Sequence, residues 1–222
     1  MTALRPAEAY TLWASSYSAE TAISALEYTA VECLGVDVRG RRLLDVGCGV
    51  ARRLTQARQS GTTLAVGVDL TPGMLAESRE HELLAAADVR AIPIADRSFD
   101  VVWCRLVLGH LPDLDAAYAE LARVCTPGGH VVVTDFHPDA AEAGHRRTFR
   151  DGEGVVREVE HHVHSPRDHR RAANRAALTQ VQRFDRVVSE TVRGFYERAG
   201  RLDAYEQQRG LAVVLALAFV RA

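Results

Sequence analysis

The feature that most constrains the fold is a short apolar run that leads directly into a glycine turn. Residues 42–46 are mostly apolar, and Gly47-Cys48-Gly49 follows them at once. Because glycine has no Cβ and accepts positive φ angles, such a turn lets the backbone approach a ligand closely. The run therefore predicts a first strand at 42–46 whose carboxyl end faces a nucleotide-like cofactor.

Apolar runs and helical patterns alternate after this strand. Parallel strands need crossover connections, which helices supply. The alternation predicts a doubly wound α/β fold with a mostly parallel seven-stranded sheet and helices on both faces. The further strands are expected at 64–68, 83–87, 99–104, 130–135, 179–186 and 211–220, and the helices at 50–60, 72–81, 114–125 and 167–177.

An N-terminal helix and a loosely patterned C-terminal part flank this alternating core. Apolar residues recur at helical spacing over 19–34, and Gly35 follows as a C-terminal cap. After Phe136 the chain becomes polar and rich in histidine before the last helix and strands. We therefore expect a single domain, 1–222, composed of an N-terminal helical cap (1–40), a cofactor-binding core (41–138) and a substrate-side segment with the last strands (139–222).

Charge and cysteine usage restrict the partners and the compartment. A formal net charge of −2 over 222 residues gives no long-range attraction for nucleic acid or anionic lipid. The four cysteines lack C-x-x-C spacing, which disfavours a zinc site and a disulfide framework. The N-terminus does not resemble a signal peptide, and the longest apolar run, 211–220, is half of the roughly 20 residues that span a bilayer. We expect a cytoplasmic protein with a small-molecule partner, without nucleic acid, membrane or metal, and we leave a homodimer open.

An acidic residue ends the second predicted strand. Asp69 lies about 20 residues beyond the glycine turn, where a carboxylate can accept hydrogen bonds from both hydroxyls of a ribose. The alternative is an ordinary strand-end carboxylate. The distance from Gly47 and the Thr71-Pro72 pair that follows favour the ribose role.

Residues 45–51, Asp-Val-Gly-Cys-Gly-Val-Ala, resemble the first motif of class I S-adenosylmethionine-dependent methyltransferases, D/E-x-G-x-G-x-G. Ala51 replaces the third glycine of that motif. A nicotinamide enzyme would instead show G-x-G-x-x-G, and Arg52 occupies the last of those positions, which counts against a dehydrogenase.

Further blocks resemble the same family in the same order. Residues 68–75 resemble its ribose-binding motif, 87–89 its adenine-binding motif, and 92–102 its L-P-F-x-D-x-S-F-D-x-V block, with 107–111 and 126–129 completing the series. The resemblance implies S-adenosylmethionine as cofactor. The residues it assigns to cofactor binding are Tyr17, Asp45, Gly47, Cys48, Gly49, Asp69, Leu70, Met74, Asp88, Val89, Cys104 and Arg105.

The N-terminal residues 10–17 resemble the Y-x-x-W-A-x-x-Y-D segment of enzymes related to the ubiquinone and menaquinone methyltransferases. Ser18 stands where that pattern has aspartate. The resemblance implies that this segment folds over the cofactor with Tyr17 in contact. It favours methyl transfer to an oxygen or carbon of a small molecule over transfer to nitrogen. The alternative is a protein of the same fold that binds S-adenosylmethionine without transferring its methyl group.

His137 and His110 are the candidates for a general base, should the acceptor carry a proton that must leave. Each follows a predicted strand that ends at the expected cleft, and imidazole titrates near neutral pH. Because the resemblance implies a structural alternative for His110, in which it caps the loop beneath the cofactor, His137 ranks first. An amine or a stabilised carbanion would need no base.

Several other residues have two interpretations. Asp45 either orients the cofactor or caps a helix, and Arg105 either faces the cleft or pairs with an acid. The histidines between residues 161 and 164 indicate a polar strand or lid rather than a metal site. Residues 137–169, together with residues near Tyr17, are predicted to form a mobile cover over the substrate cleft. The aromatic candidates for the substrate pocket or the core are Trp13, Phe195 and Tyr196, and the histidines of the possible metal site are His161, His162 and His164.

Overall fold

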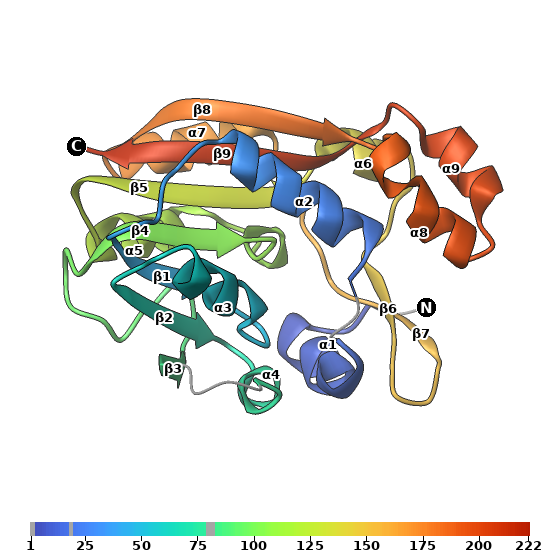
Figure 1. Ribbon diagram of the computed structural model, residues 1–222, viewed down its shortest axis with the longest axis horizontal. Coiled ribbons are helices and arrows are strands. Elements are labelled where there is room, and N and C mark those ends of the chain that lie inside the picture. Colours follow the sequence, from blue (N-terminus) through green and yellow to red (C-terminus); the bar gives the residue numbers. More distant parts are fainter. Residues whose placement is uncertain (1–2, 18–19, 79–82) are drawn as a thin grey trace.

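A twisted seven-stranded sheet runs through the molecule (Figure 1). The computed structural model describes residues 3–17, 20–78 and 83–222. The strands lie in the order β3-β2-β1-β4-β5-β9-β8; the first five are parallel, and β9 is antiparallel to both of its neighbours. The doubly wound fold is confirmed. The strands are β1 Arg42–Val46, β2 Leu64–Asp69, β3 Leu83–Ala86, β4 Phe99–Arg105, β5 Cys125–Phe136, β8 Leu178–Val187 and β9 Ala212–Arg221.

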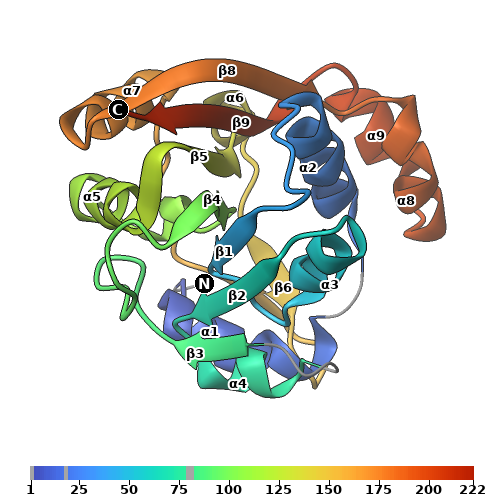
Figure 2. The same cartoon turned by 60° about the vertical axis from the view of Figure 1, so that its left-hand side comes forward.

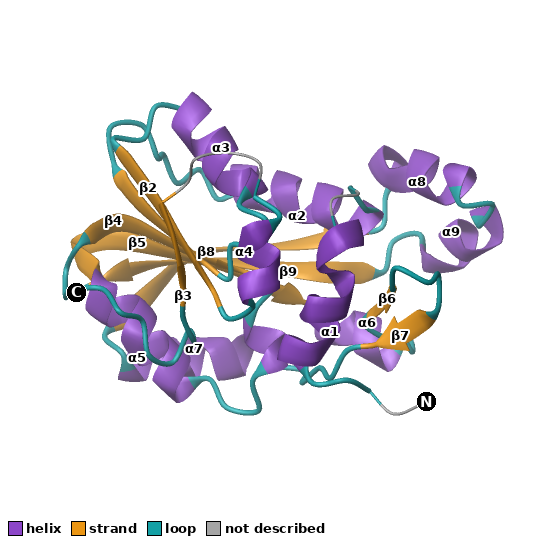
Figure 3. Ribbon diagram, turned by 90° about the horizontal axis from the view of Figure 1, so that it is seen from below, coloured by secondary structure: helices purple, strands orange, loops and turns teal. Residues whose placement is uncertain are grey.

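Helices cover both faces of the sheet, as the view along its edge shows (Figure 3). On one face, α2 (Ala22–Cys33) and α3 (Arg52–Gln59) bury their apolar residues against the strands. On the other face, α5 (Asp115–Val124) and α7 (Pro166–Arg175) do the same. Both α2 and α7 begin at capping boxes, in which Thr21 or Ser165 satisfies the backbone N–H three residues on.

Short elements gather at the carboxyl ends of the parallel strands. Helices α1 (Pro6–Trp13) and α4 (Pro72–Ala76) lie there together (Figure 2). The hairpin of β6 (Thr148–Arg150) and β7 (Val156–Glu158) lies on the side of α1 away from α4 (Figure 1). Leu4 bridges to Val159, and Ala9, Phe149 and Val159 form a small core of their own. The remaining short helices are α6 Pro138–Glu142, α8 Arg193–Arg198 and α9 Leu202–Gln208, with 3₁₀ turns at Ala14–Ser16, Leu108–His110 and Glu190–Val192.

The structure departs from the sequence-based expectation at several boundaries. Helix α4 ends at Ala76 rather than near residue 81, and positions 79–82 lie outside the described residues. Strand β5 begins at Cys125, five residues early, because Cys125 pairs with Phe99 before a register shift. The histidines at 161–164 lie in irregular backbone and not on a strand. None of the described helices combines the length and apolar character that crossing a bilayer requires.

Candidate active site

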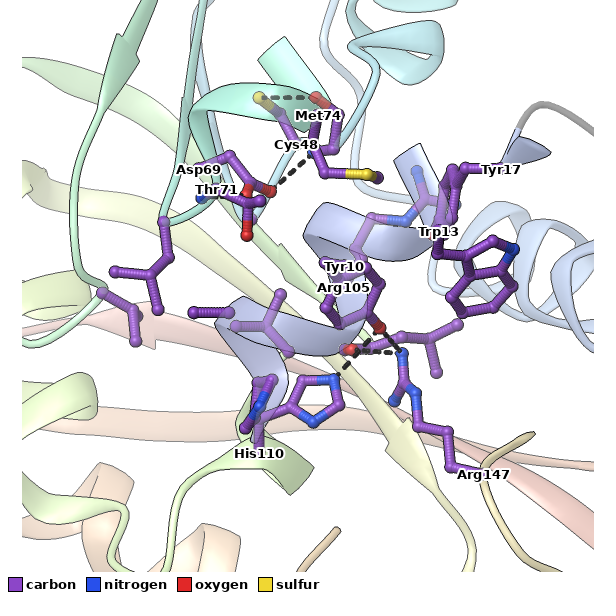
Figure 4. Close-up of a pocket in the computed structure, with 18 of the residues that line it drawn as sticks. Tyr10, Trp13, Tyr17, Cys48, Asp69, Thr71, Met74, Arg105, His110 and Arg147 are labelled. Atoms are coloured by element: carbon purple, nitrogen blue, oxygen red, sulfur yellow. Dashed lines mark hydrogen bonds between the residues drawn. The ribbon is translucent and has the colours of Figure 1, made fainter. Parts of the chain in front are cut away.

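A cavity of about 630 Å³ opens at the carboxyl ends of β1, β2 and β4. Its volume lies in the usual range for small-molecule sites. The glycine turn, α1 and the segment before β6 contribute to its lining. Figure 4 shows Cys48, Asp69 and Met74 on one side of the cavity and His110 and Arg147 on the other, with Tyr10 between them. The predicted cofactor residues that line it are Tyr17, Gly47, Cys48, Gly49, Asp69, Leu70, Met74, Asp88, Val89 and Arg105.

The glycine turn is fixed by its own backbone and by the next strands. Gly47 has φ +74°, and a Cβ there would collide with the side chain of Val107. The N–H groups of Gly47 and Cys48 both donate to the Val68 carbonyl, at 2.7 and 3.0 Å. Ala51, at the third glycine position, adopts φ 61° and caps α3, so alanine bears a left-handed conformation that glycine adopts more easily.

Asp69 holds this turn and still faces the cavity. One carboxylate oxygen accepts the N–H of Gly49 and the other the N–H of Thr71, both at 2.8 Å. Burial raises the pKa of Asp69, and these N–H donors lower it in part. The Thr71 side chain also donates to this carboxylate, so about one of its four acceptor sites stays open. That site suits a ribose hydroxyl.

Beneath the turn lies a buried ion-pair network of Glu27, Arg53 and Arg105. Arg105 donates to both Glu27 oxygens, at 2.6 and 2.8 Å, and Arg53 donates to one of them at 3.2 Å. Thr134 adds a hydrogen bond of 2.9 Å. Burial alone would raise the pKa of Glu27, but the two arginines lower it to about 2. Arg105 thus lines the cavity and also pairs with an acid, so both of its predicted roles fit the structure.

Asp45 lies beside this network without a hydrogen bond. The residue is fully buried, and neither carboxylate oxygen has a partner in the described part of the chain. Burial raises the pKa of Asp45 to about 6, against the opposing effect of Arg53 and Arg105. An orphaned carboxylate is costly unless a ligand satisfies it. A cationic group on a bound cofactor would lower that cost.

Asp88 lines the cavity near the end of β3, but an arginine already binds its carboxylate. The side chain and backbone of Arg90 donate to it at 2.6 to 3.2 Å, which lowers the pKa of Asp88. Val89 and Met74 are buried beside it. The adenine role of Asp88 stays a prediction, since the carboxylate would have to accept a hydrogen bond from the adenine amino group while Arg90 already donates to it.

On the opposite side, Tyr10, His110 and Arg147 form a hydrogen-bonded wall. Arg147 Nη2 donates to the Tyr10 oxygen at 2.6 Å, and Tyr10 Oη lies 3.1 Å from His110 Nε2. His110 Nδ1 lies 3.1 Å from the Glu160 carbonyl, which can only accept. Nδ1 is therefore the protonated nitrogen, and Nε2 accepts from the tyrosine.

The electrostatics of this wall disfavour added positive charge. Burial and the neighbouring Arg147 lower the pKa of His110 to about 3, so its ring is neutral at neutral pH. Burial raises the pKa of Tyr10 to about 12, although Arg147 opposes the shift. Both side chains therefore stay uncharged beside one arginine.

The aromatic candidates separate into two groups. Trp13 lines the cavity, stacks on Phe149 at 4.9 Å and meets Tyr17 edge-on at 4.8 Å. Phe195 and Tyr196 instead pack against the apolar core on the α2 side of the sheet. Ser18, at the aspartate position of the N-terminal pattern, lies outside the described residues.

Three predicted site residues lie away from the cavity lining, namely Asp45, described above, and His137 and Cys104. His137 caps α6, where Nδ1 accepts the Asp139 N–H at 3.2 Å, and its ring lies 3.7 Å from Asp185. The thiol of Cys104 is fully buried in the sheet, where burial raises its pKa. Cys104 points away from the cavity that its neighbour Arg105 lines, because successive residues of a strand point to opposite faces of the sheet.

Two histidines of the 161–169 segment, His161 and His169, lie beside a buried carboxylate. Burial alone would raise the pKa of Asp135, but His161 and His169, at 3.8 and 3.4 Å, lower it well below its usual range. His164 Nε2 bonds the Leu111 carbonyl at 2.8 Å. Over the described ranges, no group of three or more histidine, cysteine or acidic side chains is arranged to hold a metal.

Sequence reasoning missed Glu27, Arg53 and Arg147. Glu27 is an isolated acid in an amphipathic helix, and Arg147 follows a polar stretch, so neither belongs to a motif. Glu27 does interrupt the apolar face of α2, which was a usable signal. For Arg147 no local pattern exists, because its partner Tyr10 is 137 residues away.

Known proteins resemble this chain in both sequence and fold. A family model described as a methyltransferase domain matches residues 44–133. Demethylmenaquinone methyltransferase of Mycobacterium marinum is 37% identical over 98 residues, covering 44% of this chain and 42% of that protein. Ubiquinone biosynthesis O-methyltransferase of Alkalilimnicola ehrlichii is 36% identical over 115 residues, covering 48% and 45%. The chain spans about half the length, or less, of the curated relatives it matches.

Solved structures extend the likeness of fold to most of the chain. An S-adenosylmethionine-dependent methyltransferase from Mesorhizobium loti superposes with a TM-score of 0.70 at 21% identity, covering 90% of this chain and 100% of that one. The [4+2]-cyclase SpnF superposes with a TM-score of 0.61 at 20% identity, covering 89% and 80%. At these identities the likeness establishes the fold alone.

Proposed function

We propose that this chain transfers a methyl group from S-adenosylmethionine to a small-molecule acceptor. The premise is its class I S-adenosylmethionine-dependent methyltransferase fold and its match to a methyltransferase domain. The observation that carries the proposal is the glycine turn held by Asp69 at the edge of the cavity. The open acceptor site of Asp69, the orphaned Asp45 and the close packing around Gly47 and Gly49 all suit this cofactor.

In this proposal Asp69 binds the ribose, Asp88 and Val89 flank the adenine, and Gly47 with Asp45 accommodates the amino acid end. Tyr17 covers the turn, since a Cβ on Gly49 would lie 3.7 Å from its ring. Bound S-adenosylmethionine supplies a methyl group on a sulfonium, which is already reactive. The protein then has to align an acceptor and exclude water.

The acceptor side of the cavity is the hydrogen-bonded wall with Trp13. Its aromatic composition supports an acceptor with an apolar ring or chain and an oxygen or carbon nucleophile. The net charge of −2 supports a small molecule over nucleic acid, and four free cysteines suit a reducing compartment such as the cytoplasm. A homodimer stays a hypothesis.

For proton removal we retain His110 and set His137 behind it. His110 lines the cavity, whereas His137 does not. A ring with a pKa of about 3 is a weak base. An acceptor that arrives already ionised therefore suits this site best, with positioning as the main source of catalysis.

The test is to incubate the protein with methyl-labelled S-adenosylmethionine and an extract of its native host, and to identify labelled products by mass. A labelled small molecule that depends on intact protein is expected. The same fold serves a [4+2]-cyclase, so cofactor binding without any labelled product would favour a non-methylating role.

The variant His137→Ala refines this test once a product is known. His137→Ala should keep the transfer rate within about threefold of wild type between pH 6 and 9, far below the 10²- to 10⁴-fold typical of a lost general base. A larger loss in a folded His137→Ala protein would restore that residue as the base.

A further inference from the structure

Among the described residues, Arg147 is a partly buried arginine of the cavity that has no acid to neutralise it, whereas Arg5 and Arg52, which also line the cavity, are exposed to solvent. Arg53 and Arg105 share Glu27, and Arg90 binds Asp88. Arg147 lines the same cavity, yet no carboxylate lies within ion-pair distance of it in the portion of the chain that the structure describes. Its partners are the Tyr10 hydroxyl and the Leu106 carbonyl, at 2.6 and 3.1 Å, and both are neutral.

The guanidinium is also incompletely hydrogen-bonded. Arg147 Nη1 is shielded from water and has no partner within the described ranges. An unpaired, dehydrated N–H on a charged group is unfavourable, and natural sites keep such a group where a ligand satisfies it. Nη1 carries two N–H groups, and either can donate a charge-assisted hydrogen bond to an anionic oxygen.

The side chain is held in place before any ligand arrives. The guanidinium carbon lies 5.1 Å from the Phe136 ring centre and 5.9 Å from that of Tyr10. Its bond to Leu106 ties it to the loop directly after β4. Figure 4 shows it across the cavity from Asp69, on the side proposed for the acceptor.

We propose that Arg147 binds a carboxylate of the methyl acceptor, so that the substrate class is an acid with an apolar or aromatic body. The inference rests on the proposed function and specifies its substrate. One unpaired nitrogen matches the single charge of a carboxylate, whereas a phosphate dianion would draw on several cations. Trp13 and Phe136 supply the apolar surface beside it.

The experiment compares matched ligands that differ only in charge. Benzoate, phenylacetate, 3-phenylpropionate and indole-3-acetate are each titrated beside the corresponding primary amide, with NMR detection, with and without S-adenosylhomocysteine. Wild-type protein should bind at least one acid about tenfold more tightly than its amide, as a charge-assisted hydrogen bond predicts. Arg147→Gln should abolish that preference, and Arg147→Lys should keep part of it.

Arg146→Gln is the matched control, because Arg146 is the adjacent cavity arginine, is exposed and lies 3.9 Å from Glu158. It should keep the full preference for acids. Melting curves verify that each variant is folded.

Calorimetry with S-adenosylhomocysteine separates the acceptor from the cofactor, which has a carboxylate of its own. Arg147→Gln should bind it within about twofold of wild type. A loss of tenfold or more would assign Arg147 to the cofactor and overturn the inference. So would a wild type without preference for any acid up to 10 mM, or a preference that survives in Arg147→Gln. Failure of wild-type protein to bind S-adenosylhomocysteine would instead contradict the proposed function. In that case the titrations of acids and amides made without S-adenosylhomocysteine still decide the inference about Arg147.

Discussion

The cavity has two charged regions that differ in how their arginines are neutralised. Beneath the glycine turn, Arg53 and Arg105 converge on Glu27, whose side chain is 1% exposed. In the hydrogen-bonded wall, Arg147 meets two neutral oxygens and keeps one nitrogen unpaired. A buried charge network that is complete within the chain serves folding, whereas an incomplete one at a cavity leaves a position for a ligand. The following predictions test that difference, from the largest expected effect to the smallest.

Glu27→Ala should lower the free energy of unfolding by about 3 to 5 kcal/mol, because it leaves two arginines buried without their acid. Urea unfolding at pH 7 measures this. The control is Asp100→Ala, which removes the partly exposed pair with Arg42 and should cost about 1 kcal/mol or less. Equal losses in both variants would mean that the network has no special structural role.

The same network predicts an acid sensitivity. The folded pKa of Glu27, about 2, lies below its ordinary value. Its contribution to stability is therefore fully present above pH 5 and is lost as the pH falls toward 2. Wild-type protein should lose more stability than Glu27→Ala over that interval.

Asp45→Asn should act in the opposite direction. Because the folded pKa of Asp45 is raised from 3.8 to about 6, the ionised carboxylate opposes folding, and stability declines as the pH rises through this window. The variant should be more stable than wild type at pH 7, by up to about 3 kcal/mol, with little difference at pH 4. Thermal or urea unfolding at both pH values checks this. A variant less stable at pH 7 would show that Asp45 has a favourable partner.

Asp69→Ala should weaken S-adenosylhomocysteine binding by about 1.5 to 3 kcal/mol, since hydrogen bonds to a carboxylate exceed neutral ones. Calorimetry on folded protein measures it, with the remote and exposed Asp203→Ala as control. Unchanged affinity would remove the ribose assignment, and with it the distinction between a cofactor side and an acceptor side.

Arg147→Met should change the free energy of unfolding by less than about 1 kcal/mol. The variant loses two hydrogen bonds to neutral oxygens but also removes an unpaired buried nitrogen, and these effects oppose each other. The measurement is the same urea titration used for Glu27→Ala. A loss approaching that of Glu27→Ala would make the wall a structural network like the other.

The sequence alone located the parts of this protein whose structure is set by residues close together along the chain. Strands β1, β2 and β4, the glycine turn and Asp69 were predicted within a residue or two, because buried parallel strands are short apolar runs and strand ends carry their ligands locally. Ten of the twelve residues predicted to bind the cofactor, Gly47, Cys48, Gly49 and Asp69 among them, line the cavity. By contrast, His137 follows a strand whose carboxyl end was predicted within one residue, and it still caps α6 outside the lining, since a one-residue change reverses the direction of a side chain.

What only the tertiary structure decided is which distant charges meet. Glu27 and Thr134 are 107 residues apart, and Tyr10 reaches His110 over 100 residues and Arg147 over 137. No local pattern records such a pairing, because it depends on how α2 packs on one face of the sheet and how α1 and the segment before β6 pack at the carboxyl ends of the strands. The sequence thus determined the fold and the glycine turn from short-range periodicity and turn chemistry. Long-range packing decided the charge network beneath the turn and the hydrogen-bonded wall, because only the folded chain brings the partners of each buried charge together.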